Sequence, residues 1–158
     1  MRRIIAIVSL LLAALSLRAD FVEEPCDFDR FYIGAAETVV MPQGGGRMSD
    51  HTGAAFRLGF YITEMWAIEG EGSAVADRAG LGVRALWHWW GYERLDPFFT
   101  IGARGWIDDG QVGPAGGAGA FYHLTESLSL RMEAEATLGI ETDVGMVYSL
   151  SAGLQWSF

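Results

Sequence analysis

The chain has 158 residues, of which 20 are acidic and 11 are basic, and its sequence pI is near 4.6. This length excludes a TIM barrel and a multidomain enzyme. The acidic balance argues against a nucleic-acid partner, because phosphates require a basic surface. The single cysteine, Cys26, excludes a disulfide framework and a cysteine-based zinc site.

The N-terminus has the three parts of a secretory signal peptide. A basic start at Arg2 and Arg3 precedes an apolar run from Ile4 to Leu17, and Ala19 offers a small residue for cleavage. The run is too short for a transmembrane helix, which needs about 20 residues. The alternative is a buried N-terminal strand or helix. We predict a cleaved signal peptide over residues 1–19, a short acidic periplasmic lead-in over 20–29, and a barrel domain over 30–158.

From residue 31 onward, apolar and polar residues alternate with period two, which is typical of strands with two different faces. Most of these segments have about 9–11 residues, the length that a tilted strand needs to cross a bilayer. Their even number predicts an all-β fold, a closed antiparallel up-and-down barrel of eight strands. In chain order the segments are Phe31–Val40, Gly53–Ile62, Met65–Ala74, Gly80–Trp90, Phe98–Ile107, Gly116–Leu124, Leu128–Leu138 and Val144–Phe158.

The connections between these segments alternate between tight and wide. Thr63–Glu64 and Thr125–Ser127 are tight, and Gly91–Pro97 is a longer member of that set. One glycine-rich stretch, Gly113–Gly119, lacks the Lys-Ser/Thr pair of a P-loop and opens a strand rather than a helix. We expect its small residues to admit bulky neighbours in the lumen. The wide connections are Met41–Thr52, Val75–Ala79, Asp108–Val112 and Gly139–Asp143.

Charged residues collect on one face of the predicted strands. Folding the chain about its turns places Arg57 opposite position 70, between two glutamates, and Arg84 opposite Arg104. It places Arg104 opposite Gly117, which faces position 134, between two further glutamates. The predicted belt, a lumen charge network whose formal charges cancel, contains Arg57, Glu69, Glu71, Arg84, Arg104, Arg131, Glu133 and Glu135.

Balanced charges on one face favour a membrane barrel, which turns apolar side chains outward and keeps its lumen polar. The interior of an eight-stranded barrel is just wide enough for side chains to fill it. The alternative is a soluble, lipocalin-like barrel whose charged face meets water. The first segment does not fix its own facing. We predict that Leu58, Leu130, Met132 and Leu150 face outward, and that Arg57, Glu69, Arg84 and Glu133 face inward.

Aromatic residues give a second indication of a membrane barrel, because aromatic girdles lie at the membrane interfaces. Trp106 falls near the rim that carries the wide connections. The others fall near the strand ends that share the tight turns: Phe31, Tyr32, Phe60, Tyr61, Trp66, Trp89, Trp90, Tyr92, Phe98, Phe99, Tyr122, Trp156 and Phe158.

The end of the chain, Tyr148-x-Leu150-x-Ala152-x-Leu154-x-Trp156-x-Phe158, resembles the C-terminal signature of Gram-negative outer-membrane barrels. Asp96–Ala103 and Gly117–Leu124 look like strand openings and closings of the OmpA/OmpX-like barrel superfamily. The resemblance covers nearly all of the mature chain. It implies a Gram-negative outer-membrane location, periplasmic termini and surface loops at the wide connections. It also implies an assembly signal at Tyr148, Leu150, Leu154, Trp156 and Phe158.

No group of residues in the sequence has the spacing that catalysis requires. His51, His88 and His123 lie on different segments, without the paired spacing of a metal site. His123 with Thr125 and Glu126 invites comparison with the His, Ser and Glu of barrel-borne lipid A deacylases. However, the hydroxyl belongs to threonine and the group lies at a periplasmic turn. We predict no catalytic residue, no metal, no cofactor and no enzymatic activity.

The function expected from these features is that of a structural membrane anchor with short surface-exposed loops, in surface interaction or envelope integrity. The expected partners are outer-membrane lipid and, during biogenesis, the barrel-assembly machinery, and the expected state is a monomer. The alternative is a small outer-membrane pore or a lipid-modifying enzyme on the same scaffold. Paired charges in so narrow a barrel are expected to fill the lumen rather than to line a channel.

Overall fold

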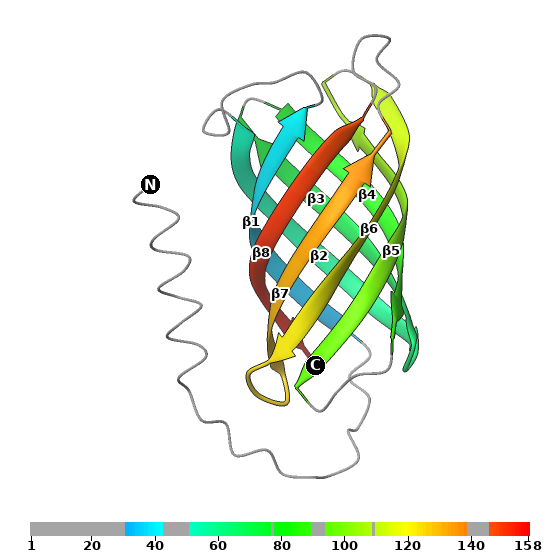
Figure 1. The fold of residues 1–158 in the computed structure, drawn as a ribbon, viewed down its shortest axis with the longest axis vertical. Coiled ribbons are helices and arrows are strands. Elements are labelled where there is room, and N and C mark those ends of the chain that lie inside the picture. Colours follow the sequence, from blue (N-terminus) through cyan, green and yellow to red (C-terminus); the bar gives the residue numbers. More distant parts are fainter. Residues whose placement is uncertain (1–30, 43–50, 77, 90–93, 109, 139–145) are drawn as a thin grey trace.

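The computed structural model describes residues 31–42, 51–76, 78–89, 94–108, 110–138 and 146–158. Eight tilted strands form one closed barrel in which every strand is antiparallel to its neighbours (Figure 1). None of the described residues belongs to a helix long and apolar enough to cross a membrane. The strands are β1 Phe31–Pro42, β2 Thr52–Thr63, β3 Trp66–Val75, β4 Arg78–His88, β5 Leu95–Trp106, β6 Gln111–His123, β7 Leu128–Thr137 and β8 Val147–Ser157.

The predicted up-and-down order is confirmed, because each strand pairs with the next and β1 pairs with β8 to close the barrel. The predicted segments all overlap observed strands. The largest difference is at β6, which begins at Gln111 rather than at Gly116. The glycine-rich stretch lies inside this strand, and its small residues do admit a lumen neighbour. A Cβ atom on Gly119 would lie 2.4 Å from Cζ of Phe98.

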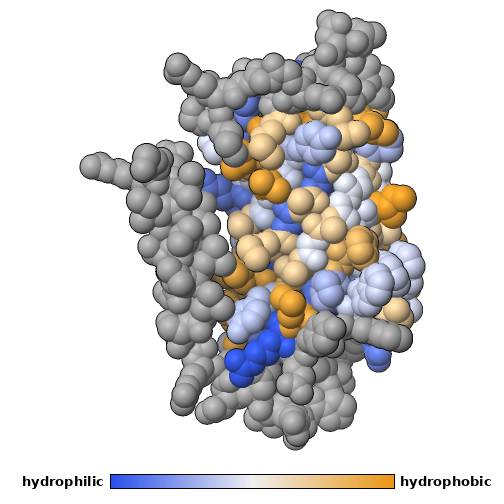
Figure 2. Space-filling model, viewed as in Figure 1, coloured by the Kyte–Doolittle hydropathy of each residue, from blue (hydrophilic) through white to orange (hydrophobic). Residues whose placement is uncertain are grey.

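The two faces of the barrel wall follow the alternation of the sequence. Along β2, Phe56 and Leu58 are more than half exposed on the outside, whereas Arg57 between them is buried. Pairing with β2 and β8 fixes the facing of β1, which turns Tyr32 and Thr38 inward. Figure 2 shows apolar residues over much of one face of the wall. The barrel therefore has the apolar exterior and polar interior of a membrane barrel.

One residue of the predicted exterior is less exposed than expected. Leu130 alternates with the inward-facing Arg131 and so lies on the outer face, but only 9% of it is exposed. Its cross-strand neighbours on that face are Tyr122 and Leu154. Large side chains directly opposite on a sheet lie close enough to cover the residue between them. The exposed fraction of Leu130 is thus set by its neighbours and not by its facing.

The aromatic residues divide into two sets that the sequence treated as one girdle. Phe31, Trp66, Trp89 and Phe99 are exposed on the outside, in agreement with a girdle. A second set points into the barrel. Three of its members, Tyr32, Tyr61 and Phe98, were predicted to belong to the girdle, and this prediction was wrong. Trp90 and Tyr92 lie outside the described residues. The inward set comprises Tyr32, Tyr61, Phe98 and Phe121.

Candidate functional site

The predicted charge network lies in the lumen of the barrel. Its arginines come from β2, β4, β5 and β7, and its glutamates come from β3 and β7. All eight side chains are buried, so these charges are shielded from solvent. A buried charge is costly unless it is paired and hydrogen-bonded. The pairing of each residue therefore decides whether the network stabilises the barrel.

Arg84 is the centre of the network, because it contacts all four glutamates. Its Nη1 donates to Glu133 at 2.7 Å and to Glu135 at 2.6 Å. Its Nη2 donates to Glu69 at 2.5 Å and to Glu71 at 2.9 Å. The guanidinium of Arg84 thus links two carboxylates of β3 to two carboxylates of β7 across the lumen.

The other three arginines each bridge two or more glutamates. Arg57 donates from Nε to Glu71 at 2.9 Å and forms an ion pair with Glu133 at 3.4 Å. Arg104 lies 3.0 Å from Glu135 and 3.3 Å from Glu71. These contacts form a closed set in which every glutamate has at least two arginine partners.

Arg131 contacts both the charge network and two aromatic rings of the lumen, those of Phe98 and Phe121. Its guanidinium donates to Glu69 and, from Nη2, to Glu133 at 2.9 Å. The same guanidinium lies over the ring of Phe98, 4.8 Å from the centroid, and 5.2 Å from that of Phe121. Contact between a cation and a ring face is attractive when both are desolvated. Arg131 is therefore held by charge on one side and by aromatic faces on the other.

Neutral polar side chains add further hydrogen bonds to the network, and the sequence analysis did not identify them. The hydroxyl of Tyr32 donates to Glu69 at 2.9 Å. Arg57 donates to Ser151 at 2.8 Å, and Arg104 donates to Ser73 at 3.0 Å. All of them share the inward parity of the charged residues, and this parity was the signal that could have found them.

The cross-strand registers predicted by folding about turn centres were wrong in detail. Arg57 lies opposite Glu71 itself, and Arg84 lies opposite Glu69. Arg84 and Arg104 do not face each other, because Arg104 lies opposite Gly82 on β4 and Gly113 on β6. The largest error, at Gly113 rather than Gly117, follows from the early start of β6.

A second group of lumen residues lies at the end of the barrel that holds the tight turns. The rings of Phe98 and Phe121 stack with centroids 4.7 Å apart, and His88 stacks on Phe121 at 5.6 Å. His88 is buried, and its Nδ1 lies 2.6 Å from Asp96. The spacing of these residues in the sequence gave no signal of this contact, because the pairing of β4 with β5 brings them together.

The histidines do not gather into a metal-binding cluster in the part of the chain that is described. His123 contacts Ser129, with Nδ1 2.9 Å from Oγ, while Thr125 accepts a hydrogen bond from the backbone of Leu128. Thr125 thus acts in a turn. Among the described residues, no cluster of histidine, cysteine, aspartate or glutamate is placed to hold a metal ion.

The predicted assembly residues all lie on the outer face of β8 or at its end. Tyr148, Leu150, Leu154 and Trp156 are exposed. Phe158 exchanges backbone hydrogen bonds with Phe31, at 2.9 and 3.2 Å, and so ties the end of the chain to β1. Its side chain is 60% exposed, so it is available to a partner outside the barrel.

Comparison with solved structures identifies the fold. The barrel is similar to the N-terminal β-barrel domain of Pseudomonas aeruginosa OprF, with a TM-score of 0.65, 15% identity, and coverage of 82% of this chain and 98% of that one. De novo designed transmembrane β-barrels give a TM-score of 0.65 at 12% identity, with coverage of 87% and 100%. Ail, the attachment invasion locus protein of Yersinia pestis, in complex with the heparin analogue sucrose octasulfate, gives 0.57 at 16% identity, with coverage of 82% and 97%.

Sequence comparison adds nothing to this likeness, since no family model and no curated protein matches the chain. At such low identities the similarity to solved structures concerns the fold alone. The chain has the fold of the small eight-stranded outer-membrane β-barrels of the OmpA/OmpX-like kind.

Proposed function

We propose that this chain is an exported protein of a Gram-negative outer membrane that acts as a structural anchor, with roles in surface interaction or envelope integrity. The observation that carries this proposal is the buried charge network, which fills the lumen with mutually paired side chains. An eight-stranded barrel encloses little more than its own side chains. A lumen occupied in this way supports a stable scaffold rather than a conduit.

Planar-bilayer recording tests the anchor against the alternative of a pore. The mature protein is first shown to fold by its change in gel mobility on boiling, and is then added to the bilayer. The anchor predicts no steady conductance, because opening the lumen would separate the arginines from their glutamates. Steady, ion-selective open levels in the wild-type protein would contradict the anchor and indicate a pore.

The charge of the wide connections restricts the kind of ligand that could bind at the surface. Ail was solved with a heparin analogue, sucrose octasulfate, which is a polyanion. In the present chain the wide connections carry two basic residues, Arg47 and Arg78. Their acidic residues are Asp50, Asp77, Asp108, Asp109, Glu141 and Asp143. Because like charges repel, we propose that the surface partner of this protein is not a polyanion.

The C-terminal residues are proposed to act as the signal for the barrel-assembly machinery. Phe158 is the sharpest place to test this, because its backbone closes the barrel while its side chain is largely exposed. Phe158→Asp should reduce the folded protein in the outer membrane and leave export unchanged. Phe158→Tyr serves as the control. Unchanged surface levels of Phe158→Asp would contradict the assembly role.

A further inference from the structure

Glu37 is an exception to the separation of charges between the two faces of the wall. It lies on β1 with the outward parity of Phe31 and Ile33, whereas Ala36 and Thr38 beside it are buried. No other outward position of the described strands carries an acidic or basic residue. Among the described residues, none forms a hydrogen bond or an ion pair with its carboxylate. Because a charge in hydrocarbon is costly, the carboxylate requires a polar environment outside the barrel.

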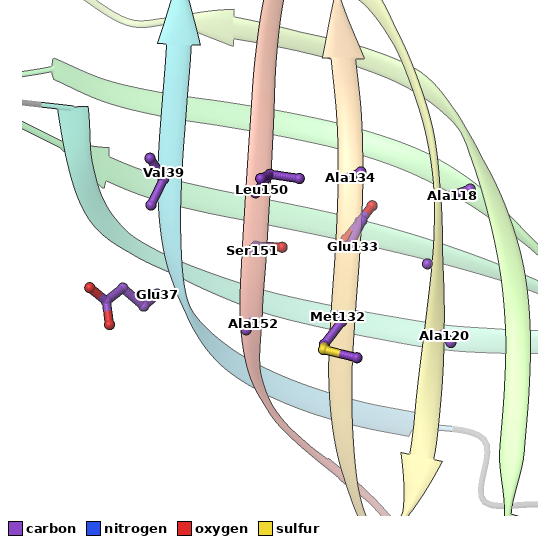
Figure 3. A pocket seen from close by; sticks show the side chains of 11 residues that line it. Glu37, Val39, Ala118, Ala120, Met132, Glu133, Ala134, Leu150, Ser151 and Ala152 are labelled. Carbon is purple, nitrogen blue, oxygen red and sulfur yellow. The ribbon is translucent and has the colours of Figure 1, made fainter. Parts of the chain in front are cut away.

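The hollow beside Glu37 does not supply that environment. It is an open hollow of about 510 Å³, lined mainly by alanine and other apolar side chains of β1, β6, β7 and β8. The side chain of Glu37 stands at its edge and extends away from Ala152 and Met132 (Figure 3). The hollow therefore suits lipid tails. The surroundings of the carboxylate are set on its other side, where β1 pairs with β2.

On that side the wall loses its bulky apolar side chains toward the end that carries the wide connections, here called the outer end. Glu37 lies opposite Ala54 on β2, and Ala54 lies opposite Ala74 on β3. The last exposed large apolar residues before the outer end are Phe56 on β2 and Ile68 on β3. The outward positions beyond them carry alanine, glycine and threonine. A lipid-facing wall of this composition offers the membrane core little apolar surface.

The opposite side of the wall stays bulky and apolar as far as its outer end. Ile107, Val112 and Leu138 lie at the outer ends of β5, β6 and β7, and all three are exposed. On β1, Val39 and Met41 are apolar but only partly exposed. The strands reach similar levels at this end of the barrel (Figure 1). The apolar belt is therefore taller around β5–β7 than around β2 and β3.

The other edge of the belt, at the tight turns, is marked by exposed aromatic residues on both sides of the barrel. These residues are Phe31, Trp66, Trp89, Phe99 and Trp156. Tilting the barrel to level its outer edge would move this aromatic edge away from the membrane interface, where such residues are preferred. A bilayer can instead adapt to a short apolar stretch by becoming thinner beside it.

We propose that the bilayer is thinned locally against β1–β3, so that lipid head groups and water of the outer leaflet reach down to Glu37. The partner of this surface is the polar layer of the membrane, and the carboxylate needs no protein partner. Local thinning and entry of water are ways in which a bilayer accommodates a charge within a membrane span. This inference rests on the proposed outer-membrane location.

Thiol labelling tests the thinning on a matched pair of alanines. Ala54 on β2 and Ala103 on β5 are both exposed on the outer face, two and three residues from the outer ends of their strands. In a Cys26→Ser background each is replaced by cysteine, and the protein is folded into phosphatidylcholine vesicles. A charged, membrane-impermeant maleimide reports contact with water, because the thiolate is the reactive form. The thinning predicts about tenfold faster labelling of Ala54→Cys than of Ala103→Cys. Equal rates would overturn it.

The contribution of Glu37 is measured in the Ala54→Cys protein. Glu37→Leu extends the apolar belt on β1, so labelling should slow toward the rate of Ala103→Cys. Glu37→Gln keeps a polar group at the same depth and should retain most of the faster labelling. An unchanged rate in Glu37→Leu, or equal slowing in both variants, would overturn the role of the carboxylate.

Two further measurements separate the thinning from its alternatives. A second copy of the chain over this face would shield Ala54→Cys, and labelling would then slow as the protein-to-lipid ratio rises. The thinning predicts a rate that does not depend on this ratio. Ile101→Cys, in the middle of β5, should label slowly in any membrane barrel. Fast labelling there would overturn the membrane location itself, whereas slow labelling there with equal rates at positions 54 and 103 would overturn the thinning alone.

Discussion

The lumen and the outer wall of this barrel are built from alternate residues of the same strands, yet they are specified in different ways. On β3, Glu69 and Glu71 each contact particular arginines, whereas Gly70 between them and Ile68 before them face outward. An inward residue must match specific partners in shape and charge. An outward residue needs only to be apolar, because the hydrophobic effect is non-directional. Substitutions of one apolar residue by another should therefore be tolerated outside, whereas substitutions inside should not.

The largest expected effect comes from removing the central arginine of the lumen. Arg84→Met leaves four buried glutamates with three arginines and should destabilise the barrel by about 3–5 kcal/mol, the usual effect of breaking a buried pair. The measurement is the urea midpoint of the protein folded in detergent, followed by tryptophan fluorescence. Arg84→Lys keeps the charge but cannot reach four carboxylates, so an intermediate loss is expected. A wild-type midpoint for Arg84→Met would refute the lumen network as a source of stability.

The second prediction places an arginine on the outer wall. Ile101 is 71% exposed in the middle of β5, and Arg104 on the same strand is buried among carboxylates. Ile101→Arg should destabilise the barrel in vesicles by about 2–4 kcal/mol, because the charge has no partner there. Ile101→Leu is the matched control, and it should change the urea midpoint little. Equal stability of the arginine variant in vesicles would mean that this face does not meet lipid.

How much of this organisation can be predicted from the sequence depends on how far apart the interacting residues lie along the chain. Strand parity is local, and it was enough to collect the whole charge network on one face of the strands. Partner choice is not local. Arg84 on β4 reaches Glu133 and Glu135 on β7, and no register between neighbouring strands encodes a contact across the lumen.

The same limit applies to the aromatic residues and to the histidines. Aromatic residues near the strand ends were taken as one girdle, but Tyr32 and Phe98 have inward parity and pack inside. The contact of His88 with Asp96 depends on the pairing of β4 with β5. The facing of β1 was left open for a related reason, since it is set by β2 and β8 rather than by its own sequence.

The smallest predicted effects come from adding a single methyl group to each face of the wall. Gly59 and Gly70 lie one register position apart on the paired strands β2 and β3, with Gly59 inside and Gly70 outside. A Cβ atom on Gly59 would lie 1.9 Å from Cζ of Tyr32, whereas the nearest atom to one on Gly70 is 3.9 Å away. The ring of Tyr32 cannot move freely, because its hydroxyl bonds to Glu69.

Gly59→Ala should therefore destabilise the barrel by about 1–3 kcal/mol, the usual effect of overpacking. Gly70→Ala should stabilise it by about 0.4–1 kcal/mol, because alanine lowers the conformational entropy of the unfolded chain and meets no obstacle here. Urea midpoints of the two variants, measured under the same conditions, should move in opposite directions. Movement in the same direction would show that the lumen around Tyr32 adapts as readily as the outer wall does, and the proposed difference between the two faces would then not extend to packing.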